Sequence, residues 1–256
     1  MAEPTERIGG LAAWAPARLP ERGHSLHRSQ ELACALRHLD IAGFSENMTG
    51  HITWQDDDGA MLVNPWGLWW REVRGRDILT LDADGAVVDG PWDVTPAIHI
   101  HTELHRRRPD ARVVVHSHPM FASVLAAVPE LPDLVHQNSS ILDGEMVLVH
   151  DYDGEVDTPL LGAALANAIG GASVALLVSH GVIVTAATMA EAVYKSVLFE
   201  RTCEMHWRLR SFGAKATPIA PALRAQLKAS LVERAATVYW DGAIRQLVAA
   251  EPEVLD

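Results

Sequence analysis

The chain has 256 residues, 48% of them hydrophobic, and its formal net charge is −12 at pH 7. This length is sufficient for a sizeable core, whereas the acidic balance argues against a nucleic-acid partner, whose phosphates favour positively charged proteins. The apolar runs are short and interrupted by charge, so we expect neither a transmembrane helix nor a membrane partner. The two cysteines, Cys34 and Cys203, form neither a disulfide framework nor a paired-cysteine metal motif.

The N-terminal segment contains several prolines and glycines and has no periodic pattern. We interpret residues 1–23 as a flexible arm, and residues 24–256 as a single domain that ends in a helical extension. Residues 1–22 carry charge and lack the apolar core of a secretory signal peptide, which predicts a cytoplasmic protein.

The first half of the domain combines one helix with short alternating segments. A helix is predicted over 25–42, where apolar residues recur at near-helical spacing and Gly43 follows. Alternating hydrophobicity around acidic turns predicts two β-hairpins. Their strands are expected at residues 51–54, 60–63, 78–81 and 86–88. Between the hairpins, the turn at 64–70 carries three of the eight tryptophans, which fit a core plug or subunit contact as well as an apolar wall beside a site.

The second half alternates apolar runs with helical patterns. Thr95 and Pro96 predict a capped helix that extends to Arg108. Thr188 and Glu191 form a capping-box pattern that opens a long helix through residue 207 or beyond. Further helices are expected at 121–128, 160–169 and 220–249, and strands at 113–119, 146–149, 173–178 and 182–185.

Two of these apolar runs lead into histidines. His116 and His118 follow the run 113–115, and their spacing places both imidazoles on one side of an extended strand. The run 175–178 leads to His180. A lone buried histidine is usually a hydrogen-bonded core or loop residue, but imidazole is also a common ligand of divalent ions. The repeated context of strand followed by histidine therefore favours a shared metal site.

Two other histidine pairs compete for this role. His99 and His101 have the same spacing as His116 and His118, and His101 and His105 would share one face of a helix. We rank both pairs lower because the polar face of a capped helix is normally solvated.

An ordered set of motifs runs through the middle of the chain: G-H-I-T at 50–53, N-P-W-G at 64–67, R-R-P-D-A at 107–111, H-S-H-P at 116–119 and S-H-G at 179–181. With this set, the chain from about His24 to Arg210 resembles the class II aldolase/adducin family. The resemblance implies an α/β fold, namely a three-layer α/β/α sandwich around a mainly antiparallel central sheet. It also implies a homo-oligomer, a cyclic tetramer whose active sites lie between subunits.

By the same resemblance, His116, His118 and His180 match the three histidines that hold zinc or another divalent ion in the aldolase-type enzymes. Three neutral imidazoles leave the ion its full charge and open positions for substrate oxygens. The expected cofactor is therefore one divalent metal ion, Zn2+, Fe2+ or Mn2+, which can stabilise an enediolate.

Three positions depart from the sugar-phosphate aldolases of this family. The acid/base glutamate nineteen residues before the first metal histidine is Ala97 here, and the catalytic tyrosine twenty-one residues after it aligns with Gln137. The phosphate-binding asparagine is His51. An ordinary sugar-phosphate aldolase is therefore not expected.

Other residues must supply the acid/base and substrate-binding roles. The catalytic candidates are His51, His101, Glu103, His136 and Gln137. For Glu103, a solvated helix position is the stronger alternative. The candidate substrate-binding residues, in the turns around the first two motifs, are Asn47, Gly50, Asn64, Trp66 and Trp70.

Three functions fit these features. The first is a metal-dependent lyase that cleaves a C–C bond, by aldol cleavage or decarboxylation, in a non-phosphorylated oxo- or hydroxy-acid. The second is a non-heme Fe(II) oxygenase that oxidatively decarboxylates an aromatic or apolar acid, as some family relatives in aminocoumarin antibiotic biosynthesis do. A non-catalytic adducin-like scaffold ranks last, because all three metal histidines are retained. The expected partner is a small carbonyl or carboxylic acid substrate.

Overall fold

A computed structural model of the chain describes residues 19–150 and 154–256. Eight strands form its central sheet: β1 His51–Gln55, β2 Met61–Val63, β3 Leu79–Leu81, β4 Val87–Asp89, β5 Val113–Ser117, β6 Met146–Val149, β7 Val174–Leu177 and β8 Val182–Ala186. Their order across the sheet is β4-β3-β2-β1-β5-β8-β7-β6. Within the described part, β6 and β7 pair in parallel and the other neighbours pair antiparallel. The predicted mainly antiparallel sheet is confirmed.

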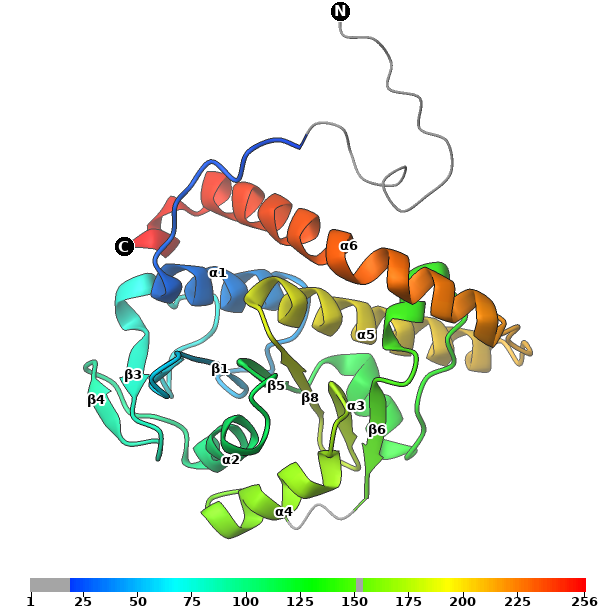
Figure 1. Ribbon diagram of the computed structural model, residues 1–256, viewed down its shortest axis with the longest axis horizontal. Helices are drawn as coiled ribbons and strands as arrows, with labels where there is room; N and C mark the ends of the chain where they lie inside the picture. The colour runs from blue at the N-terminus through cyan, green and yellow to red at the C-terminus, as the bar shows by residue number, and fades with distance from the viewer. Residues whose placement is uncertain (1–18, 151–153) are drawn as a thin grey trace, which may run out of the picture.

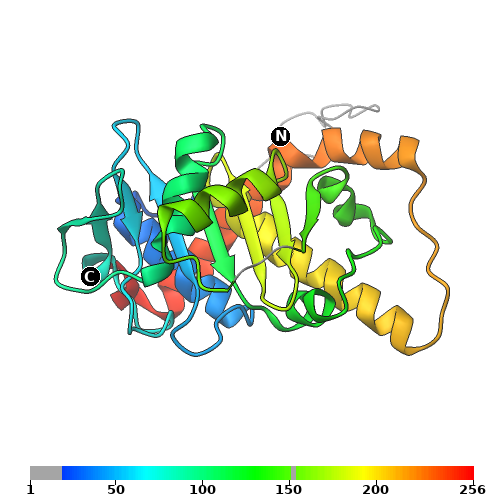
Figure 2. The same cartoon turned by 90° about the horizontal axis from the view of Figure 1, so that it is seen from below.

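Helices cover both faces of this sheet. The α-helices are α1 Arg28–Ile41, α2 His99–Arg107, α3 Met120–Ala127, α4 Pro159–Ile169, α5 Met189–Ser211 and α6 Pro221–Ala250. The 3-10 helices are η2 Gly75–Asp77, η3 Pro96–Ile98, η4 Gln137–Leu142 and η5 Pro252–Leu255. Figure 1 shows α1, α5 and α6 on one side of the strands and α2 and α4 on the other. Figure 2, seen from below, shows α2 and α4 lying across the near face. The three-layer α/β/α sandwich is therefore confirmed.

The central strands β5 and β8 are mostly apolar because both of their faces are buried. Successive side chains of a strand point to opposite faces, so Val113 and Val115 of β5 enter the larger core and Val114 enters the smaller one. β8 alternates in the same way, with Val182 in the larger core and Ile183 in the smaller. Complete burial of one such side chain contributes about 1.5–3 kcal/mol. This double burial holds the ends of β5 and β8 in fixed positions.

Both predicted hairpins are present. Thr53 of β1 pairs with Val63 of β2, and Thr80 of β3 pairs with Asp89 of β4 next to an irregularity in the register. On its other edge β1 pairs with β5, which places His51 directly opposite His116. The first hairpin therefore carries the G-H-I-T motif to the strand that bears His116, the first of the three histidines expected to bind a metal ion.

Several boundaries differ from the sequence prediction. The helix predicted from Thr95 begins as the 3-10 turn η3, where the Thr95 hydroxyl accepts a hydrogen bond from the backbone N–H of Ala97 at 3.2 Å. The first helix begins at Arg28, later than expected, and η4 was not predicted. The thiols of Cys34 and Cys203 are both free and buried.

Residues 1–18 of the predicted N-terminal arm lie outside the described part, and residues 19–23 have no regular secondary structure. The division into an arm and a single domain from residue 24 stays a prediction. Among the described residues, no helix has both the length and the apolar character needed to span a bilayer.

Candidate metal centre and pocket

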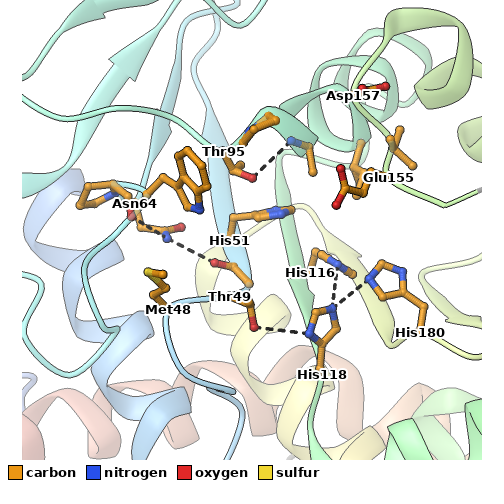
Figure 3. Close-up of a pocket in the computed structure, with 17 residues that line it drawn as sticks. Met48, Thr49, His51, Asn64, Thr95, His116, His118, Glu155, Asp157 and His180 are labelled. Carbon is orange, nitrogen blue, oxygen red and sulfur yellow. Dashed lines mark hydrogen bonds between the residues drawn. The ribbon is translucent and has the colours of Figure 1, made fainter.

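Three histidine side chains converge at one end of the central strands. His118 Nε2 lies 3.2 Å from His116 Nε2 and 3.0 Å from His180 Nε2 (Figure 3). His116 belongs to β5, His118 follows the last residue of that strand, and His180 lies in the turn between β7 and β8. The nitrogen atoms of this triad that could bind an ion all lie within 4.8 Å of one another. The histidines proposed as ligands from the sequence are thus brought together by the order of the strands.

The turn that carries His180 is tight, and its shape requires small residues. Ser179 adopts a left-handed conformation with φ of 58°. A Cβ atom on Gly181 would lie 2.4 Å from the ring of His118 and 2.6 Å from the carbonyl oxygen of Ser117. Glycine therefore lets the turn approach β5 closely enough for His180 to meet His118.

Contacts at the Nδ1 atoms of two rings, away from the converging Nε2 atoms, orient the triad. His116 Nδ1 lies 3.1 Å from the carbonyl oxygen of Val182, which can only accept, so the proton is on Nδ1. His118 Nδ1 faces the carboxylate of Glu46 at 3.3 Å and is likewise a donor. In the neutral rings, both Nε2 atoms then carry lone pairs, which repel each other at 3.2 Å unless a cation lies between them. Such outer partners are typical of histidine ligands in metal sites.

Burial keeps these imidazoles in the neutral form that binds metal. Desolvation lowers the pKa of His116 well below its usual range, and it lowers the pKa of His118 to a smaller extent despite the attraction of Glu46. Burial, together with the neighbouring His118, lowers the pKa of His180 to about 4. Protons therefore compete weakly with a metal ion at neutral pH. The donor set, its geometry and its protonation all fit a divalent ion.

The triad lines a pocket of about 420 Å³. Its apolar lining residues include Met48, Trp66 and Ile100. Glu155 and Asp157, from the segment that precedes α4, line the side of the pocket away from Met48 (Figure 3). No lysine or arginine is among the described residues that line it. The pocket thus combines the histidine triad with apolar side chains and two carboxylates.

Of the residues proposed to bind substrate, Gly50, Asn64 and Trp66 line the pocket, and Asn47 and Trp70 do not. Asn47 accepts a hydrogen bond from the backbone N–H of Thr49 at 3.2 Å and so shapes the turn. Asn64 is buried, and its side-chain oxygen accepts from the backbone N–H of Ile52 at 2.8 Å. These two asparagines hold the pocket wall in place through the backbone.

The tryptophans of the 64–70 turn have different environments. Trp70 is fully buried, and its indole N–H donates to the carbonyl oxygen of Gly50 at 3.1 Å. Gly50 has a φ of 90°, and a Cβ there would lie 2.8 Å from the Trp70 ring. Trp66 is 49% exposed at the pocket, and Trp69 is 52% exposed outside it. Trp70 is therefore a core plug, whereas Trp66 forms an apolar wall of the pocket.

Among the residues proposed as acid or base, His51 lines the pocket. Glu103 is buried and forms ion pairs with Arg106 and Arg107, so the expected solvated position was wrong. The reason is that α4 packs closely on α2, with the Glu103 side chain next to Gly162. His136 and Gln137 also lie outside the pocket lining, His136 next to Thr202 at 3.2 Å and Gln137 exposed at the start of η4.

The interpretation of His101 and His105 as residues on a solvated helix face was also wrong, because both are buried. They do not point at a shared ion either. His101 Nδ1 and His105 Nε2 lie 2.6 Å and 2.7 Å from the hydroxyl oxygen of Thr53. His101 Nε2 in turn lies 2.5 Å from His51 Nδ1, so these side chains support His51 from behind.

Sequence reasoning missed the two carboxylates of the pocket and the role of Thr53. Glu155 and Asp157 lie in an irregular segment with no periodicity, where the one available signal was their position just before the Thr158 cap of α4. Thr53 was read only as part of an alternating strand. Its inward direction follows from the strand alternation, but its contact with two histidines depends on how α2 packs on the sheet.

Comparisons with known proteins agree with this geometry. A family model described as the Class II Aldolase and Adducin N-terminal domain matches residues 30–207. A 5-methylthioribulose-1-phosphate/5-deoxyribulose-1-phosphate aldolase of Rhodospirillum rubrum is 29% identical over 174 residues, which cover 68% of this chain and 77% of that protein. A 4-hydroxy-3-prenylphenylpyruvate oxygenase/4-hydroxy-3-prenylbenzoate synthase of Streptomyces roseochromogenus subsp. oscitans is 30% identical over 201 residues, covering 76% of this chain and 72% of that protein.

A solved structure has the same fold. The L-fuculose 1-phosphate aldolase of Glaciozyma antarctica superposes with a TM-score of 0.79 at 22% identity, over 97% of this chain and 100% of that one. The family resemblance and the fold inferred from the sequence motifs are both confirmed.

Proposed function

Because the chain belongs to the class II aldolase and adducin family, we propose that it is a divalent-metal-dependent lyase that cleaves a C–C bond in a non-phosphorylated oxo- or hydroxy-acid. The observation that carries the proposal is the convergence of three Nε2 atoms, with separations of 3.0 and 3.2 Å, beside a pocket of small-molecule size. His116, His118 and His180 would hold the ion, either Zn2+, Mn2+ or Fe2+. Once bound, the ion would act as a Lewis acid that stabilises the enediolate formed in aldol cleavage or decarboxylation.

Proton transfer requires a group within hydrogen-bond reach of the substrate. The family's glutamate position is Ala97, which lines the pocket and has no ionisable group. Glu155 and His51 line the same pocket, and in Figure 3 the His51 side chain extends toward the side where Glu155 lies. We assign the acid/base role of the missing glutamate to His51 and Glu155. Glu103, His136 and Gln137 lie outside the pocket lining, which argues against direct contact with the substrate.

The charge of the pocket supports a substrate without a phosphate group. A phosphate monoester binds well where an arginine or lysine side chain can pair with its charge. The lining residues described here include no such cation, and they include the carboxylates of Glu155 and Asp157. A carbonyl or carboxylic acid can still bind, because its oxygens would face the metal ion held by the triad.

A second candidate is a non-heme Fe(II) oxygenase. It is favoured by the relative named as an oxygenase and by the apolar lining residues Met48, Trp66 and Ile100, which suit an aromatic or apolar acid. A non-catalytic scaffold ranks third, because a scaffold has no need for three histidines whose ring nitrogens converge on one point.

Metal analysis after anaerobic purification separates these functions. We expect about one zinc or manganese ion per chain, together with C–C cleavage of an oxo- or hydroxy-acid that proceeds without dioxygen. Stoichiometric iron with dioxygen consumption would replace the lyase by the oxygenase. A protein with no bound metal and no turnover after metal addition would support the scaffold.

We also propose a homotetramer with the pocket close to a subunit boundary, based on the family and on the exposed Trp69. A cytoplasmic location remains a prediction from the sequence.

A further inference from the structure

A continuous row of buried polar groups connects the backbone of one strand to the pocket. It begins at the carbonyl oxygen of Ala111, which lies 2.6 Å from His105 Nδ1. His105 Nε2 lies 2.7 Å from the Thr53 hydroxyl, which lies 2.6 Å from His101 Nδ1. His101 Nε2 lies 2.5 Å from Nδ1 of His51, whose ring lines the pocket. We call this set, from Ala111 to His51, the histidine row.

The carbonyl group of Ala111 fixes the direction of every hydrogen bond in the histidine row. A carbonyl oxygen can only accept, so His105 Nδ1 carries a proton and its Nε2, in a neutral ring, is an acceptor. The hydroxyl of Thr53 must then donate to His105. Because a hydroxyl has one proton, Thr53 accepts from His101 Nδ1. His101 Nε2 is therefore an acceptor, and it receives the proton of His51 Nδ1.

This direction holds only while His105 and His101 are neutral, since a charged imidazole donates from both nitrogens and would reverse the bonds that follow it. Burial keeps them neutral. Desolvation lowers the pKa of His105 to about 4, and it lowers the pKa of His101 well below its usual range.

We propose that the histidine row locks His51 in the Nδ1–H tautomer, so that its Nε2 presents a lone pair to the pocket and selects substrates that carry a hydroxyl group beside the metal-bound end. This inference rests on the proposed function for its substrate, but its tautomer can be tested alone. His51 lies opposite His116 in the sheet, with their ring centres 5.0 Å apart. A substrate hydroxyl that donates a hydrogen bond to His51 therefore lies next to the triad.

The Nδ1–H tautomer of His51 would give the pocket a selectivity that an asparagine at position 51 would not give. An asparagine side chain offers an N–H donor as well as an oxygen acceptor, and so it can bind an anion. The locked His51 offers only a lone pair to the pocket, which attracts an O–H donor and repels a phosphate or carboxylate oxygen. Thr53, His101 and His105 are positioning residues, because they act on the substrate only through His51.

The first test measures the tautomers directly. In protein with 15N-labelled histidine at pH 7, long-range 1H–15N correlation spectra distinguish Nδ1–H from Nε2–H rings, and signals are assigned from single His→Gln variants. We expect Nδ1–H forms for His51, His101 and His105, in the metal-free protein and in the zinc-loaded one. An Nε2–H form or a charged ring at His51 would overturn the proposal, even if the protein proves to be a metal-dependent lyase.

The second test measures selectivity without turnover. The probes are lactate, whose hydroxyl can donate, and 2-methoxypropionate, which has the same carboxylate but a methoxy group in place of the hydroxyl and therefore no O–H donor. Their binding to the Co2+-loaded protein is followed in the visible spectrum. We expect the preference for lactate to fall about ten-fold in Thr53→Val, which removes the hydroxyl at nearly constant shape.

The conservative variant Thr53→Ser keeps the hydroxyl and should retain the preference. A merely structural role for Thr53 predicts that both acids lose affinity equally, which would overturn the proposal. If Thr53→Val does not fold, the comparison is made with His105→Gln, for which the same loss of preference is expected. A protein that binds no Co2+ would contradict the proposed function, whereas the tautomer measurement would still decide the histidine row.

Discussion

His118 Nε2 lies 3.0 Å from His180 Nε2, although the two residues are 62 positions apart in the chain. The contact is made by β8, which pairs with β5 on one edge and with β7 on the other. The turn before β8 is therefore held against the end of β5. We expect that replacement of either histidine lowers the affinity of the triad for a metal ion.

Replacement of His180 by alanine should remove most of the bound metal, because two imidazoles hold a divalent ion weakly. The loss in affinity should exceed the roughly 100-fold that follows when only an outer partner of a ligand is removed. Metal content per chain is the measurement. The control is His38→Ala, since His38 bonds to Tyr239 on α6, away from the triad. Full metal content in His180→Ala would show that His180 is not a ligand.

Substitution of Gly181 by alanine should weaken metal binding without removing any ligand. The new Cβ would lie 2.4 Å from the His118 ring and 2.6 Å from the backbone oxygen of Ser117, so the ring must shift. We expect about a 10- to 100-fold loss in affinity, as for other disturbances of ligand orientation. Gly171→Ala is the matched control, because nothing lies within 4 Å of its Cβ position. Equal metal affinities in the two variants would contradict the expected displacement.

The stability of the protein should fall as the pH falls from about 6.5 to 4. Burial lowers the pKa of His105 from 6.5 to about 4, so the unfolded chain binds a proton in this range before the folded chain does. Unfolding therefore takes up protons, and this histidine contributes a slope of up to about 1.4 kcal/mol per pH unit.

We expect His105→Gln to be less stable near pH 7 and to show a flatter dependence in denaturant titrations between pH 4.5 and 6.5. Thr53→Ser keeps the partner of His105 and should keep the slope of the original protein. A slope in His105→Gln equal to that of the original protein would mean that His105 does not remain neutral in the folded state.

Sugar phosphates should bind poorly. The described pocket lining contains the carboxylates of Glu155 and Asp157 and no lysine or arginine that could pair with a phosphate. Competition by sugar phosphates against an oxo- or hydroxy-acid substrate tests this expectation, with the corresponding unphosphorylated sugars as controls. Micromolar inhibition that disappears when the phosphate is removed would contradict it.

The triad could be inferred from the sequence because its signal is local. His116 and His118 follow a β-branched run, and a second buried run leads to His180, so strand termini could be identified without knowing the fold. The sheet, both hairpins and the two long helices near the C-terminus follow from periodicity for the same reason. The antiparallel pairing that brings the strand ends together came only with the family resemblance.

What the sequence did not predict depends on packing between distant elements. The spacing of His101 and His105 is the same on a solvated helix and on a buried one, and the packing of α2 on Thr53 of the sheet decides between them. Glu103 was misjudged because its burial depends on the packing of α4 on α2. Glu155 lies in an irregular segment, and its place in the pocket depends on how α4 is positioned by the strands on either side of it.

The last prediction concerns assembly. Trp69 is 52% exposed and Trp66 49% exposed on the chain alone, and soluble proteins rarely leave large neighbouring aromatic side chains in water. We expect light scattering to give the mass of a tetramer, and we expect Trp69→Gln to weaken that assembly. Leu160→Gln is the control, because Leu160 is 79% exposed on α4, on the opposite side of the chain's layers from α1 and α5. A monomeric mass at micromolar concentration, with metal content and activity intact, would show that each chain forms its pocket alone.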